Sequence, residues 1–195
     1  MAAAALQGKR IVITQADDFM GPALCEVCTE QGAEVIADSR SLVGPEMPAS
    51  VVAEAGVIDI LIANLAVSAP ATPLLDVPDS EWREVFAALV DPLPRLFRAV
   101  LPQMIERRAG KILVMGSAAA LRGMKRASTY SAARGAQLAY VQAAGVELAT
   151  HNVQVNAIAQ NFVENRTYYP PELQENPRFQ ERLKREVPLG RLVTS

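Results

Sequence analysis

Short aliphatic runs alternate with longer segments of helical periodicity along most of the chain. The aliphatic runs cover residues 10–14, 34–38, 58–63, 111–115 and 153–158. Continuous apolar runs of this length, bounded by turn residues, are typical of strands buried on both faces of a parallel sheet. Strands that alternate with helices predict an α/β fold, a doubly wound parallel sheet with right-handed crossovers.

The intervals between these runs carry the spacing of helices. We expect helices at about 22–31, at about 129–150 and at 177–186, and over 80–108 we expect two helices that meet near Pro92 and Pro94. Only residues 39–57 separate the second predicted strand from the third. A helix, a strand and another helix hardly fit there, so an outer strand beyond the second one should be short or missing.

The length and composition favour one soluble domain. A chain of 195 residues is long enough for a single α/β domain, 1–195, and too short for two typical ones. The net charge of −2 gives no reason to expect a nucleic-acid or anionic-membrane partner. The first seven residues lack the features of a signal peptide, and prolines and polar residues interrupt the apolar stretch 57–75. We therefore expect a cytoplasmic protein without a membrane span.

Two features with possible redox or metal chemistry have simpler interpretations. Cys25 and Cys28 form a C-x-x-C, but they fall in a predicted helix, where positions three apart share a face. Packing in the core is therefore favoured over a thioredoxin-like redox site. His151 is the only histidine and has no cysteine or carboxylate cluster around it, so we expect no metal site.

The strongest chemical signal is the pattern S-x12-Y-x3-R formed by Ser117, Tyr130 and Arg134. Ser117 follows a predicted strand, while Tyr130 and Arg134 lie one turn apart on a predicted helix and project from the same face. The pattern resembles the catalytic set of the short-chain dehydrogenase/reductase family, in which the last residue is normally lysine. Residues 64–66 and 155–158 are similar to that family's N-A-G turn and V-N-x-I strand.

This resemblance implies a Rossmann-like sheet, the short-chain dehydrogenase/reductase fold. Proteins of this family normally add one more helix and strand after the segment corresponding to 188–191, so we expect a C-terminal strand and helix to be absent from this chain. Leu89 stands where dehydrogenases of the family usually have an asparagine that holds a proton-relay water, so that relay should be absent.

The loop after the first strand departs from the dehydrogenase pattern. Gln15 and Phe19 replace the first two loop glycines, and only Gly21 remains. Glycines there allow the backbone to approach a pyrophosphate, whereas a phenyl ring would occupy that space. Asp17 and Asp18 should point to solvent. The resulting T-x4-F-x-G, together with the arginine, resembles the halohydrin dehalogenase branch of the family, which implies that no cofactor is used.

Membership of that branch implies closure of vicinal haloalcohols to epoxides, and reverse epoxide opening by halide or another small anion. Tyr130 is the expected base, Arg134 favours its phenolate electrostatically, and Ser117 donates to the substrate oxygen. The expected halide site lies between Phe19 and the loop Gln160, Asn161, Phe162 and Val163, with backbone N–H groups and the helix beginning near Pro22 supplying positive partial charge. Members of the branch often have proline at the position of Gln160.

Several alternatives remain open. Tyr168 and Tyr169 are expected to line the substrate mouth, with ordinary loop packing as the other interpretation. Asp38 stands where an NAD enzyme keeps its ribose-binding carboxylate, although a strand-end turn residue is the favoured interpretation. An NAD(P)-dependent reductase and a catalytically silent Rossmann-type scaffold are the alternative functions. The family resemblance also implies a homotetramer.

Overall fold

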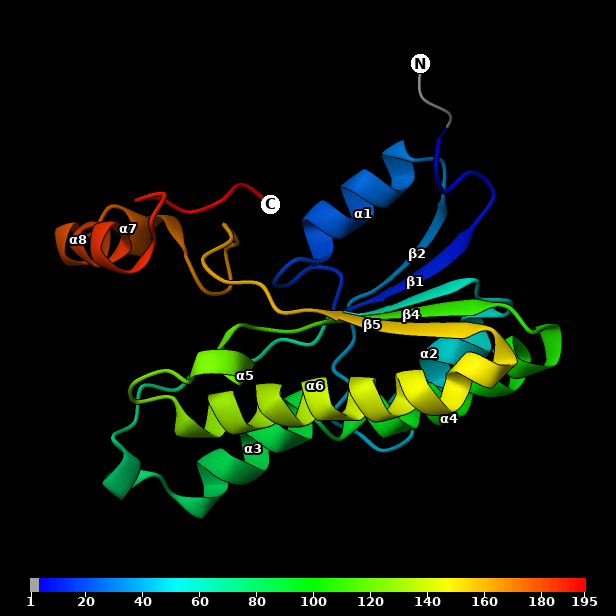
Figure 1. Ribbon diagram of the computed structural model, residues 1–195, viewed down its shortest axis with the longest axis horizontal. Coiled ribbons are helices and arrows are strands. Elements are labelled where there is room, and N and C mark those ends of the chain that lie inside the picture. The colour runs from blue at the N-terminus through cyan, green and yellow to red at the C-terminus, as the bar shows by residue number, and fades with distance from the viewer. Residues whose placement is uncertain (1–3) are drawn as a thin grey trace.

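The computed structural model describes residues 4–195, so the first three residues of the N-terminal segment lie outside the described residues. Five parallel strands form one sheet in the order β2-β1-β3-β4-β5 (Figure 1). The strands are β1 (Arg10–Thr14), β2 (Glu34–Asp38), β3 (Ile60–Ala63), β4 (Gly110–Met115) and β5 (Val153–Ile158). The predicted doubly wound parallel sheet is confirmed, and each predicted strand is present.

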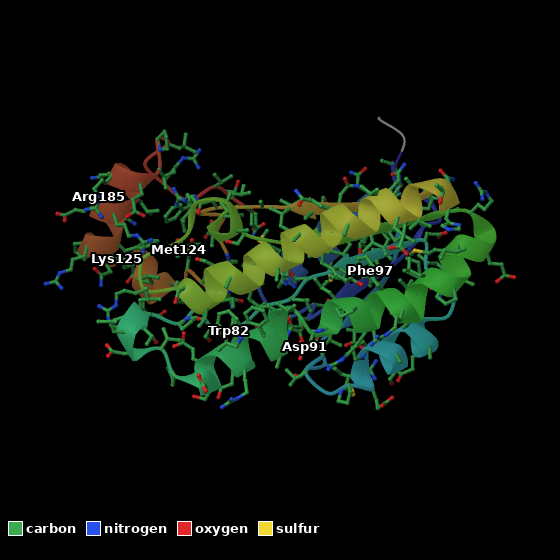
Figure 2. All side chains as sticks on the ribbon, turned by 60° about the horizontal axis from the view of Figure 1, so that its bottom comes forward. Trp82, Asp91, Phe97, Met124, Lys125 and Arg185 are labelled. Carbon is green, nitrogen blue, oxygen red and sulfur yellow. The ribbon has the colours of Figure 1, made fainter. Side chains whose placement is uncertain are left out.

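Helices cover both faces of this sheet. They are α1 (Gly21–Glu30), α2 (Met47–Ala55), α3 (Asp79–Leu89), α4 (Pro92–Arg107), α5 (Ala119–Arg122), α6 (Ser128–Leu148), α7 (Pro171–Gln174) and α8 (Pro177–Glu186), with short 3-10 turns at Leu74–Asp76 and Ala149–His151. Helix α1 lies on one face, and α2, α4 and α6 lie on the other (Figure 1). Figure 2 shows α3, which carries Trp82, and α4, which carries Phe97, running beside α6. The predicted break near Pro92 is confirmed, since α4 begins at that proline.

The connection from β2 to β3 is a single helix. Helix α2 has Pro48 in its first turn and buries Val51, Val52 and Ala55. Within residues 4–195 no strand lies between β2 and β3, which confirms the expected loss of the outer strand and makes β2 an edge of the sheet. Helix α2 itself was not among the helices expected from the sequence.

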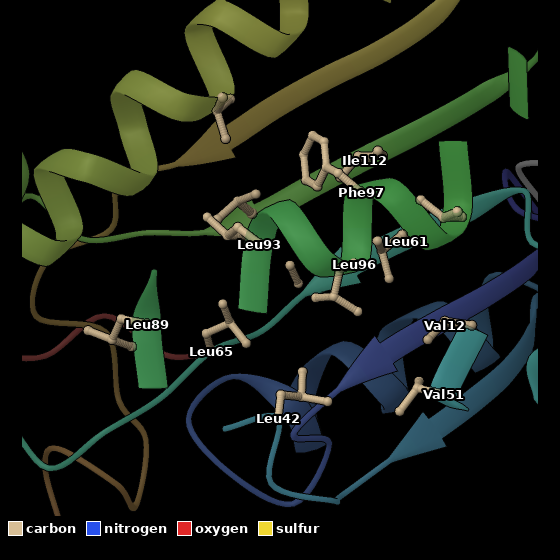
Figure 3. Close-up of a cluster of buried hydrophobic side chains, with 14 of the residues drawn as sticks. Val12, Leu42, Val51, Leu61, Leu65, Leu89, Leu93, Leu96, Phe97 and Ile112 are labelled. Atoms are coloured by element: carbon tan, nitrogen blue, oxygen red, sulfur yellow. The ribbon is translucent and has the colours of Figure 1, made fainter. Parts of the chain in front are cut away.

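The core is divided by the sheet. On the face of α2, α4 and α6, strand residues such as Val12, Leu61 and Ile112 pack against Leu96 and Phe97 of α4 (Figure 3). On the face of α1, a smaller cluster joins Ile11, Ile13 and Ile62 to Cys28. Cys25 and Cys28 are both free thiols, and burial raises the pKa of each. Their packing against this cluster confirms the core interpretation.

Two classes of site find no support in the described part of the chain. Residues 4–195 contain no grouping of three or more histidine, cysteine or acidic side chains that could hold a metal ion. None of the helices described is both long enough and apolar enough to cross a membrane. His151 lies in the 3-10 turn before β5.

Candidate active site

The candidate residues lie around the carboxyl ends of the parallel strands. Ser117 follows β4, Phe19 lies in the loop after β1, and residues 159–170 follow β5. Helix α6 carries Tyr130 and Arg134 past the same ends. Loops at the carboxyl ends of parallel strands are where α/β sheets place their ligand sites, so the sequence pattern and the topology point to one location.

Arg134 is the centre of the site and is 1% exposed. Its Nη1 donates to the carbonyl of Met115 at 2.9 Å and to Oε1 of Gln137 at 2.9 Å. Its Nη2 donates to the carbonyl of Leu65 at 3.0 Å and to the hydroxyl of Tyr168 at 3.2 Å. The side chain therefore ties helix α6 to the ends of β3 and β4.

The acceptors around this cation are neutral. No ion pair of residues 4–195 includes Arg134. Its guanidinium carbon lies 5.1 Å from the centre of the Tyr130 ring and 5.4 Å from the centre of the Phe19 ring. Aromatic faces attract cations but do not neutralise them. A buried positive charge without a carboxylate favours negative charge that develops beside it.

Tyr130 and Ser117 approach this cation from different elements. Tyr130 is 4% exposed and shares one helix face with Arg134. Ser117 is partly exposed, and its Oγ accepts the N–H of Ala119 at 3.2 Å. Ser117 and Arg134 both line a cavity of about 10 Å³, which is room for about one water molecule. The structure thus brings all three predicted catalytic residues to one end of the sheet.

The loop after β1 has the backbone shape of a glycine-rich loop without its glycines. Gln15 has φ +44° and Phe19 has φ +52°, both in the left-handed region that favours glycine. Gly21 is retained because a Cβ there would lie 2.2 Å from the carbonyl oxygen of Ala16. The backbone of this loop is therefore left-handed at the two positions where the family has glycines, although both residues here carry side chains.

Gln15 and Phe19 are both tied to other parts of the site by hydrogen bonds. Oε1 of Gln15 accepts the N–H of Ala66 at 2.5 Å, and the N–H of Phe19 donates to Oγ1 of Thr167 at 2.6 Å. The Phe19 ring is 7% exposed. A pyrophosphate needs free backbone N–H groups and space above them. In this arrangement the residues do not fit a nicotinamide dinucleotide.

The other residues relevant to a nucleotide have local roles. Asp17 and Asp18 are exposed, as expected. Oδ2 of Asp38 pairs with Arg40 at 2.6 Å, and Oδ1 accepts the N–H of Arg40 at 3.0 Å. Asp38 thus closes the turn at the end of β2, which agrees with the favoured interpretation. Leu89 is fully buried and contributes only its carbonyl, which accepts Nε2 of Gln137 at 2.6 Å.

Tyr168 is partly buried and contacts the interior of the site. Its ring meets the Phe19 ring edge-on at 5.1 Å and the Tyr130 ring at 6.0 Å between centres. Its hydroxyl accepts from Arg134. Burial, as the largest cause, raises the pKa of Tyr168 well above its usual value, so this phenol stays neutral.

The residues proposed for the halide site divide between two clusters. Val163 packs with Phe19 and Tyr168. Phe162, at φ +52°, turns its ring instead into a cluster with Phe179 and Leu183, where Tyr169 stacks on it at 6.0 Å. The structure therefore does not bring the rings of Phe162 and Tyr169 to Phe19. Two further residues lie near the end of β5: the carbonyl of Gln160 accepts the N–H of Ala118, and Asn161 is exposed.

Two residues of the site, Gln137 and Thr167, were not singled out from the sequence, and Asn64 was noted only as part of the 64–66 turn. Gln137 follows Arg134 by three positions on α6, and this spacing could have marked it as a partner. Nδ2 of Asn64 donates to the carbonyls of Gln15 and Asp18, each at 2.9 Å, and so holds the loop to the end of β3. Thr167, the partner of Phe19, lies 148 positions away along the chain and carries no sequence signal.

The known proteins that this chain resembles include reductases and dehalogenases. The sequence model of a family described as enoyl-(acyl carrier protein) reductase matches residues 2–195. A 3-oxoacyl-(acyl-carrier-protein) reductase of Vibrio harveyi is 27% identical over an alignment of 184 positions, and the match covers 82% of this chain and 75% of that protein.

Solved structures with the same fold include proteins described as dehalogenases. One described as a dehalogenation enzyme is 30% identical, with a TM-score of 0.90 over 96% of this chain and 86% of that one. A halohydrin dehalogenase bound to ethyl (2S)-oxiran-2-ylacetate is 26% identical, with a TM-score of 0.86 over 95% of this chain and 85% of that one.

Proposed function

Since this chain belongs to the short-chain dehydrogenase/reductase family, we propose that it is a halohydrin dehalogenase of that family. It would convert vicinal haloalcohols into epoxides without a cofactor, and open epoxides with small anions in reverse. The observation that carries this proposal is Phe19, which fills the dinucleotide loop and lies against the buried, carboxylate-free Arg134. The 30% identity to a protein described as a dehalogenation enzyme supports it.

The reaction is a displacement within one molecule. The substrate hydroxyl gives its proton to the oxygen of Tyr130, the resulting electron pair attacks the neighbouring carbon, and the carbon–halogen bond breaks as halide leaves. Ser117 donates a hydrogen bond to the substrate oxygen and fixes it against Tyr130. A proton acceptor positioned in this way contributes on the order of 10²–10⁴-fold to the rate.

Arg134 supplies charge in this scheme and does not carry protons. A guanidinium stays protonated at all ordinary pH values, so it acts as a fixed positive charge beside the phenolate and the developing alkoxide. The carbonyls of Met115 and Leu65 hold the guanidinium in place. No carboxylate shares the charge among the residues described, so no fixed negative charge competes with the reacting oxygens for it.

The halide leaves into the space bounded by Phe19, Val163 and the backbone of residues 160–163. Helix α1 begins two residues after Phe19, and its N-terminus adds positive partial charge. Tyr168 and Tyr169 are proposed to contact the substrate from the segment that follows. By resemblance to the family we also propose that the protein is a cytoplasmic homotetramer.

One observation favours a second candidate, an NAD(P)-dependent reductase: the Vibrio harveyi relative is a reductase. The deciding experiment incubates the purified protein with a vicinal chloro- or bromo-alcohol and measures halide and epoxide together. Release of both in equal amounts without nucleotide supports the dehalogenase. Absence of turnover together with saturable NADH or NADPH binding supports the reductase, and absence of both supports a silent scaffold.

A further inference from the structure

Two of the three proposed catalytic side chains are closed off from solvent, since Arg134 is 1% exposed and Tyr130 is 4% exposed. The cavity that Ser117 and Arg134 line does not reach Tyr130, and its volume is only about 10 Å³. A haloalcohol has several heavy atoms, and such a cavity holds at most one water molecule. A side chain must therefore leave its position before a substrate can reach Tyr130.

Tyr168 is the side chain that fills the required place. Its ring lies edge-on to the rings of both Phe19 and Tyr130, and its hydroxyl accepts a hydrogen bond from Nη2 of Arg134. In the proposed reaction the substrate oxygen lies against Tyr130 and beside the charge of Arg134, so it competes with the hydroxyl of Tyr168 for this region. The phenol of Tyr168 thus presents a hydroxyl and an apolar ring where the proposed reaction needs a hydroxyl and an apolar substituent.

We propose that Tyr168 occupies the substrate position in the resting protein and swings out when a haloalcohol binds, so that one hydroxyl exchanges for another on Arg134. The inference rests on the proposed function for the identity of the incoming oxygen. The vacated position is lined by the rings of Phe19 and Tyr130, so it suits haloalcohols with an aromatic substituent next to the hydroxyl-bearing carbon. Tyr168 is then the residue that determines substrate size.

The elements around the site differ in their freedom to move. Tyr130 and Arg134 lie within the 21-residue helix α6, where many backbone hydrogen bonds fix them. Tyr168 lies between β5 and α7 on a segment without a long helix or strand. The N–H of Phe19 donates to Thr167, the N–H of Tyr168 donates to Oδ1 of Asn165 at 2.8 Å, and the N–H of Tyr169 donates to the carbonyl of Asn165 at 3.0 Å. These bonds are fewer per residue than those of α6. Segments with few such contacts open at low cost in free energy.

The first test removes the ring and returns it as a small molecule. Tyr168→Ala leaves a space shaped for p-cresol, the analogue of the tyrosine side chain. p-Cresol should raise the melting temperature of Tyr168→Ala, and bind at least tenfold more weakly to the wild-type protein and to Tyr168→Ala/Arg134→Gln. Equal binding by all three proteins would overturn the proposal. This test needs no turnover, so it is separate from the test of the dehalogenase activity.

The second test removes only the hydroxyl. In the closed state Tyr168 occupies the substrate position, and in the open state it has swung out. Tyr168→Phe loses the hydrogen bond to Arg134 in the closed state alone, so the population of the open state increases. Hydrogen exchange of the Phe19 amide should then accelerate, and KM for a haloalcohol should fall roughly tenfold with little change in kcat. Tyr140→Phe, at the distant α4–α6 contact with Phe97, is the matched control and should change neither quantity.

The outcomes separate the two proposals. Unchanged amide exchange in Tyr168→Phe would show that the Arg134 bond does not hold the segment closed, and would reject the proposed role of Tyr168. Faster amide exchange in Tyr168→Phe, together with no haloalcohol turnover by the wild-type protein, would support the role of Tyr168 and reject the dehalogenase assignment.

Discussion

The guanidinium carbon of Arg134 lies 5.1 Å from the centre of the Tyr130 ring, one helical turn away, and no carboxylate among residues 4–195 pairs with it. Buried arginines usually have a partner of opposite charge, because an unpaired buried ion is costly. Here carbonyls, an amide and a phenol take that place. The positive charge is therefore available to any anionic oxygen that forms on Tyr130 or on a substrate.

Tyr130→Phe should abolish dehalogenation and leave the fold intact, because it removes one hydroxyl from a ring that stays packed. Loss of the positioned base should lower kcat by a factor of about 10²–10⁴ or more. Ser117→Ala should also be severely impaired. The measurement is halide release, with circular dichroism to verify folding. Turnover near the wild-type rate in Tyr130→Phe would refute its role as the base.

Arg134→Gln should move the activity profile to higher pH, because the phenolate loses the adjacent positive charge that favours it. The measurement is kcat as a function of pH. Arg134→Lys keeps a positive charge and should move the profile less. A profile of unchanged shape with a uniformly lower rate would assign Arg134 a structural role only.

The wild-type protein should bind neither NADH nor NADPH at sub-millimolar concentrations. The ring of Phe19 fills the loop, and its N–H already donates to Thr167. Fluorescence titration of each nucleotide with the protein provides the measurement. Saturation with micromolar affinity would contradict the dehalogenase assignment and favour the reductase.

Bromide should bind beside Phe19 and the 160–163 segment, and inhibit as a product. Anomalous scattering from a bromide-soaked crystal would locate it, and bromide should compete with azide in epoxide opening. Val163→Phe should weaken halide inhibition and ring opening together, because Val163 packs in the cluster of Phe19. Phe162→Trp should instead disturb the contact with α8. An anomalous peak only at another place would show that the proposed halide site is wrong.

Gly21→Ala should destabilise the protein, because the added Cβ would lie 2.2 Å from the carbonyl oxygen of Ala16. Overpacking of this kind costs about 1–3 kcal/mol. Gly135→Ala is the matched control, since a Cβ at this position in α6 meets nothing within 4 Å. It should stabilise by about 0.5–1 kcal/mol. Urea unfolding of both variants measures the difference, and equal effects would contradict the packing argument.

The elements that the sequence predicts best are those with an uninterrupted pattern. Strand β5 and helix α8 have the expected bounds, 153–158 and 177–186. The apolar run of β5 and the charged, amphipathic pattern of α8 are both local signals in the sequence. Helix α2 was not expected. Its nine residues begin next to Pro48 and bury only one narrow face, so their pattern is hard to distinguish from a loop.

Positions within the site depend on backbone angles that the sequence does not reveal. The spacing of Ser117, Tyr130 and Arg134 follows from one strand and one helix, so it was predictable. The direction of Phe162 depends on its left-handed backbone, which turns the ring toward α8. The depth of Tyr168 depends on a turn closed by Asn165 and on a contact with Thr167, formed between segments far apart in the sequence.

The left-handed backbone at Gln15 and Phe19 has a consequence for the history and engineering of this loop. A residue with a Cβ is strained by about 1–2 kcal/mol in that conformation, so the loop stores energy that two glycines would release. The main chain is already left-handed at both positions, so glycines there would keep its path and remove two side chains from the loop. The double substitution Gln15→Gly and Phe19→Gly should therefore relieve this strain and open the space that Phe19 fills.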